Sequence, residues 1–221
     1  MKIVLIENHF YPEVGAVLTE YRLSKAFIRK GLDVYVVTTR PRAYRLPRGY
    51  PRPSYPKSKA FTSEYLEGVL VYRVSSWSSR RDVPSQRLIE TISQVPMLFA
   101  VSVALHLCKR PDVMLAAGDI EAIATIPAYL VKMLTGTPLV VILHDISSRQ
   151  LADVGMASSP LRAVVAVLEK ILYSLADKIV VHSPGNKEVL VSMGVNPAKV
   201  EVVYLWTDVE RIRPGVKDWC K

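Results

Sequence analysis

Residues 4–31 read VLIENHFYPEVGAVLTEYRLSKAFIRKG. An apolar run leads into a polar, aromatic and proline-bearing loop with one glycine, and the next segment has the composition of a helix. Gly31 lies where glycine commonly ends a helix. We therefore predict a strand at 2–7, a helix at 17–30 and a second strand at 33–38. A strand, a helix and another strand in this order form the unit from which parallel sheets are built.

The same alternation continues through most of the chain. Further strands are expected at 68–74, 111–117, 138–145, 176–183 and 198–205, and further helices at 86–109, 119–136, 160–175 and 183–194. Nearly continuous apolar strands are typical of a parallel sheet that is buried on both faces. The predicted fold is therefore α/β, a doubly wound, mostly parallel sheet with helices on both faces, as in Rossmann-like domains. We expect one domain over residues 1–207 and the start of a linker over 208–221.

The chain is basic, with a formal net charge of +9 over 221 residues. This charge favours an anionic partner such as phosphate, an acidic membrane surface or nucleic acid. Five arginines gather in a loop rich in proline and tyrosine, and we predict that they contact an anionic surface: Arg40, Arg42, Arg45, Arg48 and Arg52. A solvated surface loop is the alternative. Nucleic acid is disfavoured because no recognised nucleic-acid-binding module surrounds the loop.

Residues 95–107, VPMLFAVSVALHL, are the most apolar stretch. A membrane-spanning helix needs about 20 residues, so this stretch is too short to span. Two interpretations stay open: burial between the sheet and a partner element, or partial insertion at a membrane interface next to Arg87, Lys109 and Arg110.

The two cysteines, Cys108 and Cys220, have neither metal-ligand spacing nor a disulfide framework. This favours a reducing compartment, so we expect a cytoplasmic protein. Contact of the basic loop and the apolar stretch with a membrane would make it peripheral at the inner membrane face. No ligand cluster indicates a metal, and no cofactor is expected.

The first loop carries one glycine, Gly15, whereas a dinucleotide-binding loop carries G-x-G-x-x-G. A single glycine before a helix can still present backbone N–H groups to an oxygen-rich ligand, and Tyr11 can stack on a sugar ring. The alternative is that Gly15 permits a turn and that Tyr11 packs in the core.

Two more loops follow strands whose carboxyl ends should lie at the same edge of the sheet, where such folds bind ligands. His144 and Asp145 follow one strand and could orient hydroxyls or a phosphate, although a loop histidine is often merely a hydrogen-bonded polar residue. Hydrolysis is weakly supported because no G-x-S-x-G turn is present. In the stretch HSPGNKE (residues 182–188), Ser183 is a suitable N-cap for a helix that begins at Pro184. The N-terminus of the same helix could also face a phosphate.

The assembled pattern resembles the N-terminal domain of GT-B-fold, retaining family-4 glycosyltransferases, in particular bacterial and archaeal sugar transferases of surface-polysaccharide synthesis. FYPEVGA resembles the family's YFPPEIGA, and GVLVYRV resembles its G-V-x-V-x-R-V strand. The most specific likeness is the run from ADKIVVHS to VERIRP, where the first domain of the family leads into the second. The chain departs from the family at DISSRQ, where D-L-W-P-E-S is usual, and at YLWTD, where P-N-G-V-D is usual.

The resemblance implies the acceptor-binding half of an enzyme that transfers sugar from a nucleotide-diphosphate sugar, its co-substrate, with retention of configuration. Gly15 and Ala16 would face the donor phosphate or the acceptor. His144 and Asp145, the candidate catalytic residues, would face the acceptor or the transferred sugar. The acceptor would be a sugar or a lipid-linked molecule, and the donor-binding second domain, absent here, would be a covalent or separate partner. Alone, the chain is expected to be inactive. The alternative is a non-catalytic module that binds anionic lipid or a partner protein.

Overall fold

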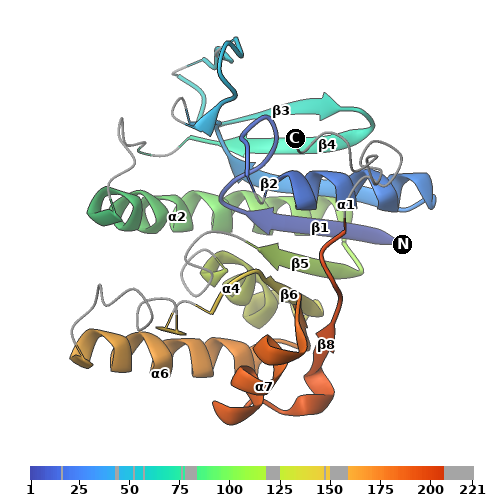
Figure 1. The fold of residues 1–221 in the computed structure, drawn as a ribbon. Coiled ribbons are helices and arrows are strands. Elements are labelled where there is room, and N and C mark those ends of the chain that lie inside the picture. Colours follow the sequence, from blue (N-terminus) through green and yellow to red (C-terminus); the bar gives the residue numbers. More distant parts are fainter. Residues whose placement is uncertain are drawn as a thin grey trace, which may run out of the picture.

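The computed structural model describes residues 1–15, 17–42, 45–51, 53–56, 58–75, 77, 84–117, 125–146, 148–149 and 159–206. These residues form one eight-stranded sheet with helices on both faces (Figure 1). The elements in chain order are β1 (Lys2–Glu7), α1 (Val17–Arg29), β2 (Asp33–Thr39), β3 (Phe61–Leu66), β4 (Val69–Val74), α2 (Pro84–Lys109), β5 (Val113–Ala117), α4 (Ile126–Thr135), β6 (Leu139–Leu143), α6 (Ser159–Leu175), β7 (Lys178–Val181), α7 (Pro184–Ser192), the 3₁₀ helix η2 (Pro197–Lys199) and β8 (Val200–Val202).

The strand order is β3-β4-β2-β1-β5-β6-β7-β8, and every neighbouring pair is parallel except β3 and β4. From β1 the chain builds toward β4 on one side, and from β5 it builds toward β8 on the other. The direction of winding therefore switches between β1 and β5, and the crevice at the carboxyl ends of these strands is where such sheets bind ligands. The predicted doubly wound, mostly parallel α/β fold is confirmed.

The core lies on both faces of the sheet because successive residues of a strand point to opposite sides. In β1, Ile3 and Leu5 face the cluster that contains Tyr21 of α1. Val4 and Ile6 face the larger cluster, to which α2, α4, α6 and α7 contribute side chains. The middle strands thus carry apolar residues on both faces, which explains the uninterrupted apolar runs of the sequence.

Strand β3 is the element that the sequence interpretation missed. It pairs antiparallel with β4, and its residues FTSEYL are half-exposed or exposed throughout, as suits an edge strand with little burial. The turn between β3 and β4 places Glu67 at φ 47° and Gly68 at φ 90°. Two consecutive residues with positive φ are typical of a two-residue hairpin turn. The dipeptide Glu67-Gly68 between two apolar residues was therefore the available signal.

Helix α2 covers the sheet beside α4 and contacts β1, β2 and β4. Its window Ile92–Lys109 spans 18 residues with mean hydropathy 1.4, so by length and composition it could cross a membrane. This differs from the prediction that the apolar stretch is too short, because the apolar window extends past residues 95–107 at both ends. Nevertheless, α2 contacts the sheet, as a helix that covers a sheet in a globular domain does. The predicted helix start at 119–124 and the predicted linker at 208–221 lie outside the described residues.

Candidate functional site

Three segments that are distant in sequence meet at the carboxyl edge of the sheet. His144 directly follows β6, and its Nε2 lies 2.7 Å from Oε1 of Glu20 in the first turn of α1. The ring of His182, which follows β7, lies 4.9 Å from the ring of His144. The topology therefore brings the loops after β6 and β7 to the start of α1, as expected from the predicted sheet.

Trp206, the last described residue of the chain, also belongs to this group. Its ring meets the ring of His182 edge-on, with 6.1 Å between centroids, and its Nε1 donates a hydrogen bond to the carbonyl oxygen of Thr19 at 3.2 Å. Nδ1 of His182 lies 2.8 Å from the carbonyl oxygen of Val203. We call Glu20, His144, His182 and Trp206 the rim cluster.

The carboxylate of Glu20 determines how His144 is presented. Glu20 is buried, whereas His144 keeps 17% of its side chain exposed. A carboxylate oxygen accepts hydrogen bonds, so Nε2 of His144 carries a hydrogen toward Glu20. The ring is thereby held in one orientation at the surface, where it can meet a polar ligand. Asp145, the next residue, is exposed at the same edge.

In the loop after β1, Gly15 forms the turn that was the alternative to ligand contact. Gly15 has φ 107°, a region that residues with a side chain rarely adopt, and its carbonyl oxygen accepts a hydrogen bond from Leu18 in α1. Tyr11 stacks on Tyr21 with 4.5 Å between ring centroids, which is the packing that was left open as the alternative. Ligand contact by Tyr11 and Gly15 stays a prediction, and Ala16 lies outside the described residues.

Ser183 begins α7 as an N-cap. Its Oγ accepts a hydrogen bond from the backbone N–H of Asn186 at 3.1 Å, and Pro184 occupies the first helical position. The predicted capped helix start is confirmed, and phosphate contact by Ser183 stays a prediction. Beside it, a hollow of about 530 Å³ is lined by Arg149, Gly185, Asn186, Glu188, Val189 and Ser192.

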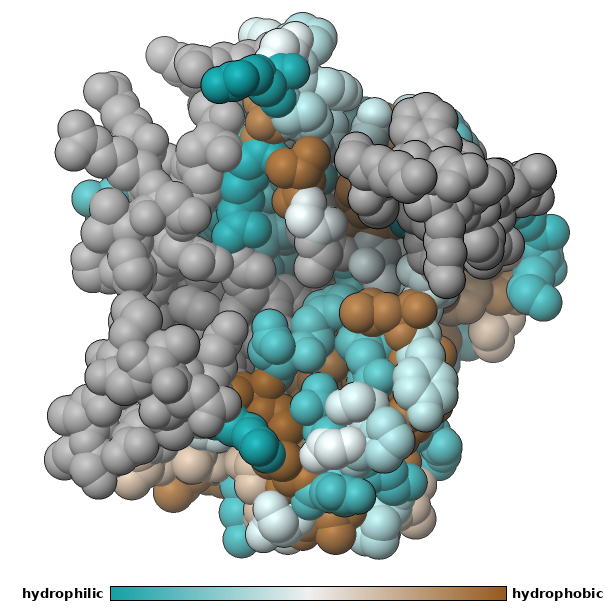
Figure 2. Space-filling view, viewed as in Figure 1, coloured by the Kyte–Doolittle hydropathy of each residue, from teal (hydrophilic) through white to brown (hydrophobic). Residues whose placement is uncertain are grey.

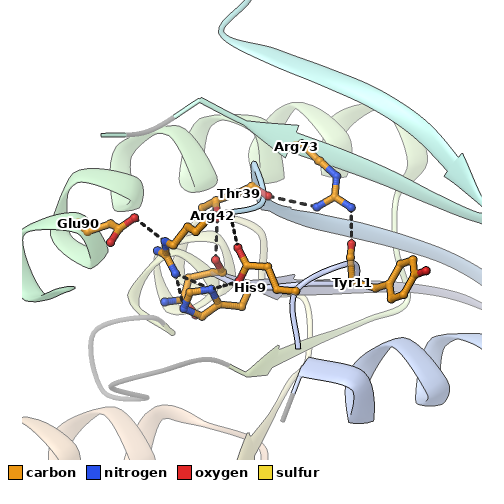
Figure 3. Close-up of polar contacts among 8 residues, drawn as sticks. His9, Tyr11, Thr39, Arg42, Arg73 and Glu90 are labelled. Atoms are coloured by element: carbon orange, nitrogen blue, oxygen red, sulfur yellow. Dashed lines mark hydrogen bonds and ion pairs between the residues drawn. The ribbon is translucent and has the colours of Figure 1, made fainter. Parts of the chain in front are cut away.

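Arg42 differs from its predicted role at an anionic surface. Its side chain is 3% exposed, and its guanidinium contacts Glu90 of α2 and the ring of His9 (Figure 3). The backbone N–H of Arg42 donates to Oε1 of Glu13 at 2.6 Å, and Oε2 of Glu13 lies 2.6 Å from Nδ1 of His9. A buried positive charge requires such partners. Arg42 therefore joins α2 to the first loop and is not available to an external anion.

The other described arginines of the predicted basic loop also differ in how far their side chains are exposed. Arg40 donates to the carbonyl oxygens of Pro56 at 3.2 Å and Lys59 at 2.7 Å, so it holds its own loop together. Arg45 is half-buried and Arg48 is exposed. Arg52 lies outside the described residues. Of the four described arginines, Arg48 alone has the exposure that contact with an anionic surface requires.

A second buried acidic residue, Glu7, lies within electrostatic range of Glu20 of the rim cluster. The carboxyl group of Glu7 is buried at the end of β1, and burial raises its pKa well above the usual range, helped by the nearby charges of Glu20 and Glu13. The guanidinium of Arg73, itself fully buried, acts in the opposite direction on this pKa and donates to the carbonyl oxygens of Tyr11 and of Thr39 (Figure 3). A carboxyl group in this environment favours its neutral form.

Chemically, the rim offers hydrogen-bonding and stacking groups without a paired nucleophile and base. Among the described residues, no group of three His, Cys, Asp or Glu side chains could hold a metal ion. The arrangement suits the recognition of hydroxyl or phosphate oxygens. The sequence interpretation named His144, Asp145 and Ser183 in this region and missed Glu20, His182 and Trp206, although His182 directly precedes the serine that it singled out.

Comparison with known proteins finds one matching family and several solved structures of the same fold. The sequence profile of Glycosyltransferase Family 4 matches residues 15–211. No curated protein matches the chain significantly in sequence. Sucrose-phosphate synthase from Thermosynechococcus elongatus superposes with a TM-score of 0.70 at 15% identity, covering 97% of this chain and 50% of that chain.

Two further solved structures share the fold. HepE from Anabaena in complex with UDP and glucose has a TM-score of 0.55 at 17% identity, covering 95% of this chain and 46% of that one. The catalytic domain of Starch Synthase IV from Arabidopsis thaliana, bound to ADP and acarbose, has a TM-score of 0.59 at 12% identity, covering 99% of this chain and 54% of that one. The chain thus spans about half the length of these structures.

Proposed function

Because the chain belongs to glycosyltransferase family 4, we propose that it is the acceptor-binding half of a retaining glycosyltransferase that uses a nucleotide-diphosphate sugar. The observation that carries this proposal is the rim cluster, in which Glu20 holds His144 at the carboxyl edge of the sheet. Two of the related structures contain UDP with glucose and ADP with acarbose, which supports a sugar nucleotide as co-substrate. This chain covers about half of the chain in each of these structures.

Within this proposal, the rim holds the acceptor and a second domain supplies the donor. His144 and Asp145 contact hydroxyl groups of the acceptor or of the transferred sugar. Gly15 and Ala16 present backbone N–H groups to phosphate oxygens next to the start of α1, where the helix dipole favours negative charge. Glu20 is a positioning residue that acts through His144. The isolated chain performs no transfer because the donor-binding half is needed to complete the cleft.

We further propose a lipid-linked acceptor, such as a polyprenyl diphosphate carrying sugar, in the synthesis of a surface polysaccharide. The net charge of +9 suits a diphosphate and an anionic membrane, and a cytoplasmic protein peripheral to the inner membrane face would meet such an acceptor. Arg48 is the described loop arginine with the exposure to contribute.

Calorimetric titration with farnesyl diphosphate, a short soluble polyprenyl diphosphate, tests the acceptor site. We expect binding by the parent chain, weakened about tenfold by His144→Ala, which corresponds to about 1.4 kcal/mol. His106→Ala is the matched control, since His106 bonds Thr137 away from the rim. Equal affinities of parent and His144→Ala would remove His144 from the acceptor site, and turnover of UDP-glucose by the chain alone would contradict its proposed inactivity.

A second candidate, a non-catalytic module on anionic lipid or a partner protein, is favoured by the apolar exposure of one helical layer described below. One experiment distinguishes the acceptor-binding half of an enzyme from a non-catalytic module. Adding a separately produced donor-binding domain of a family-4 enzyme restores sugar transfer if the chain is an acceptor half, and restores none if it is a module.

A further inference from the structure

Helices α2, α4 and α6 form a layer on one face of the sheet. Helix α2 contacts α4, α4 contacts α6, and all three contribute to the same hydrophobic cluster. Their outward sides carry large apolar residues that are exposed in the structure: Ile89, Ile92, Leu107, Leu130, Met133, Leu134, Val164, Val167, Ile171 and Leu175. Part of this surface is visible at the lower left of Figure 2, where tan and brown residues lie over α6. We call it the helical-layer face.

The opposite face of the sheet differs. Among the described side chains of α1, which covers that face, no large apolar residue is exposed. Soluble domains carry scattered exposed apolar residues, but a contiguous apolar surface across adjacent helices is typical of an interaction site. Among the described residues, ten exposed large apolar side chains therefore lie on α2, α4 and α6 and none on α1.

The charges of the helical-layer face are also one-sided. Helices α2, α4 and α6 contain only two acidic residues, Glu90 and Glu169, and both are buried, at 1% and 0% exposure. Glu90 pairs with Arg42, and Glu169 accepts hydrogen bonds from the backbone N–H of Ser148 and the hydroxyl of Tyr173. The three helices thus turn no carboxylate outward.

Positive charge remains on and beside this face. Lys170 of α6 is exposed, Arg110 follows α2 and is exposed, and Lys109 is half-buried at the end of α2. Lys132 of α4 pairs with Asp177, which lies outside the three helices. A surface whose helices combine apolar side chains with positive charge and turn no carboxylate of their own outward matches a membrane with anionic head groups, and the exposed carboxylate beside it, Asp177, is neutralised by Lys132.

We propose that the helical-layer face docks on an anionic lipid surface, with the apolar side chains of α4 and α6 entering the head-group boundary. The positive charge of this face favours a lipid surface over a second copy of the chain, because two copies would bring two positive faces together. The inference deepens the proposed function: it rests on that function for its purpose, the presentation of a lipid-linked acceptor to the rim. Docking itself needs neither acceptor nor nucleotide sugar.

Vesicle flotation of the purified chain at low salt tests the proposal, using vesicles of phosphatidylglycerol and phosphatidylcholine against vesicles of phosphatidylcholine alone. We expect binding to the anionic vesicles and loss of binding as salt screens the charges. The double variant Val167→Glu, Ile171→Glu places two carboxylates on exposed positions of α6, at 59% and 52% exposure, and should weaken binding at least about tenfold.

The matched control is Phe61→Glu, Tyr65→Glu on the edge strand β3, where the replaced residues are 47% and 74% exposed. It makes the same change in net charge and removes the same number of exposed apolar side chains, so it should bind within about twofold of the parent because it leaves the docking face intact. Circular dichroism confirms that both variants are folded.

Three results would overturn the proposal. The first is absence of parent binding to anionic vesicles, and the second is equal binding by parent and α6 double variant. The third is self-association of the parent without lipid that the α6 double variant abolishes, which would make a second copy the occupant. None of these results alters the titration with farnesyl diphosphate, so failure of docking and failure of the proposed function are distinguishable.

Discussion

Glu20 and His144 are 124 positions apart in sequence, and their side chains meet with 2.7 Å between Oε1 and Nε2. This contact joins the first turn of α1 to the end of β6 across the point where the sheet reverses its winding. It fixes which nitrogen of His144 carries hydrogen and thereby which atoms the ring can offer to a ligand.

Replacing Glu20 should therefore change the state of the His144 ring. In Glu20→Leu the acceptor at Nε2 is lost, and we expect the tautomer balance of neutral His144 to change and the chain to lose about 1–3 kcal/mol of stability. Glu20→Gln keeps an acceptor oxygen at the same distance along the side chain and should retain the parent tautomer. Ring ¹⁵N chemical shifts of His144 at alkaline pH report the tautomer. Identical ring shifts in parent and Glu20→Leu would show that Glu20 does not position His144.

Arg42 should be essential for stability. Arg42→Met keeps the backbone N–H that Glu13 accepts from but leaves the buried carboxylate of Glu90 without its positive partner, and removal of one member of a buried pair costs about 3–5 kcal/mol. Arg48→Met, at an exposed position in the same loop, should change stability by no more than about 0.5 kcal/mol. Urea denaturation measures both. A small cost at Arg42 and a large one at Arg48 would reverse the assignment of buried and exposed arginines.

The raised pKa of Glu7 predicts a dependence of stability on pH. A carboxyl group whose pKa is higher in the folded chain than in the unfolded chain contributes its full stability below the unfolded value, about 4.3, and loses it as pH rises toward the folded value. Glu7→Gln removes this titration. The free energy of unfolding of the variant relative to the parent should therefore increase from pH 5 to pH 8, by at most about 1.4 kcal/mol per pH unit. A difference that is constant over this range would mean that Glu7 titrates normally.

Gly15 should tolerate no side chain without strain. Its φ of 107° is unfavourable for alanine although no atom lies within 4 Å of the added Cβ, so Gly15→Ala should cost about 1–2 kcal/mol through the backbone alone. Gly185→Ala is the control, because Gly185 lies in α7 and the nearest atom to its added Cβ is 3.9 Å away. The melting temperature should fall by about 2–8 °C for Gly15→Ala and remain nearly unchanged for the control. Equal melting temperatures would indicate that the loop relaxes to a conformation that alanine accepts.

Much of the fold could be predicted from local pattern. The strands at β1, β2, β5, β6 and β7 are apolar on both faces, so their runs are visible without any knowledge of their neighbours. The sheet edge was harder to predict. Strand β3 buries little and alternates polar residues, so its formation depends on pairing with β4, which local pattern does not report.

The candidate site could be predicted only in part, because its members depend on partners far apart in sequence. Position at the end of β6 was enough to single out His144. Its partner Glu20 reads as an ordinary first-turn acidic residue of a helix, and Trp206 as part of a departure from the family pattern. Arg42 resembled its neighbours in a basic loop. Its burial depends on Glu13 and Glu90, which are 29 and 48 positions away.

Titration of the histidine signals tests the central claim most directly, since the chain contains four histidines. Two of them, His144 and His182, lie in the rim cluster, whereas His106 bonds Thr137 before β6 begins. On addition of farnesyl diphosphate, the ring ¹H and ¹³C signals of His144 and His182 should move together and saturably while those of His106 stay fixed. Movement of His106 with unmoved signals from His144 and His182 would place the ligand elsewhere and contradict an acceptor site at the rim.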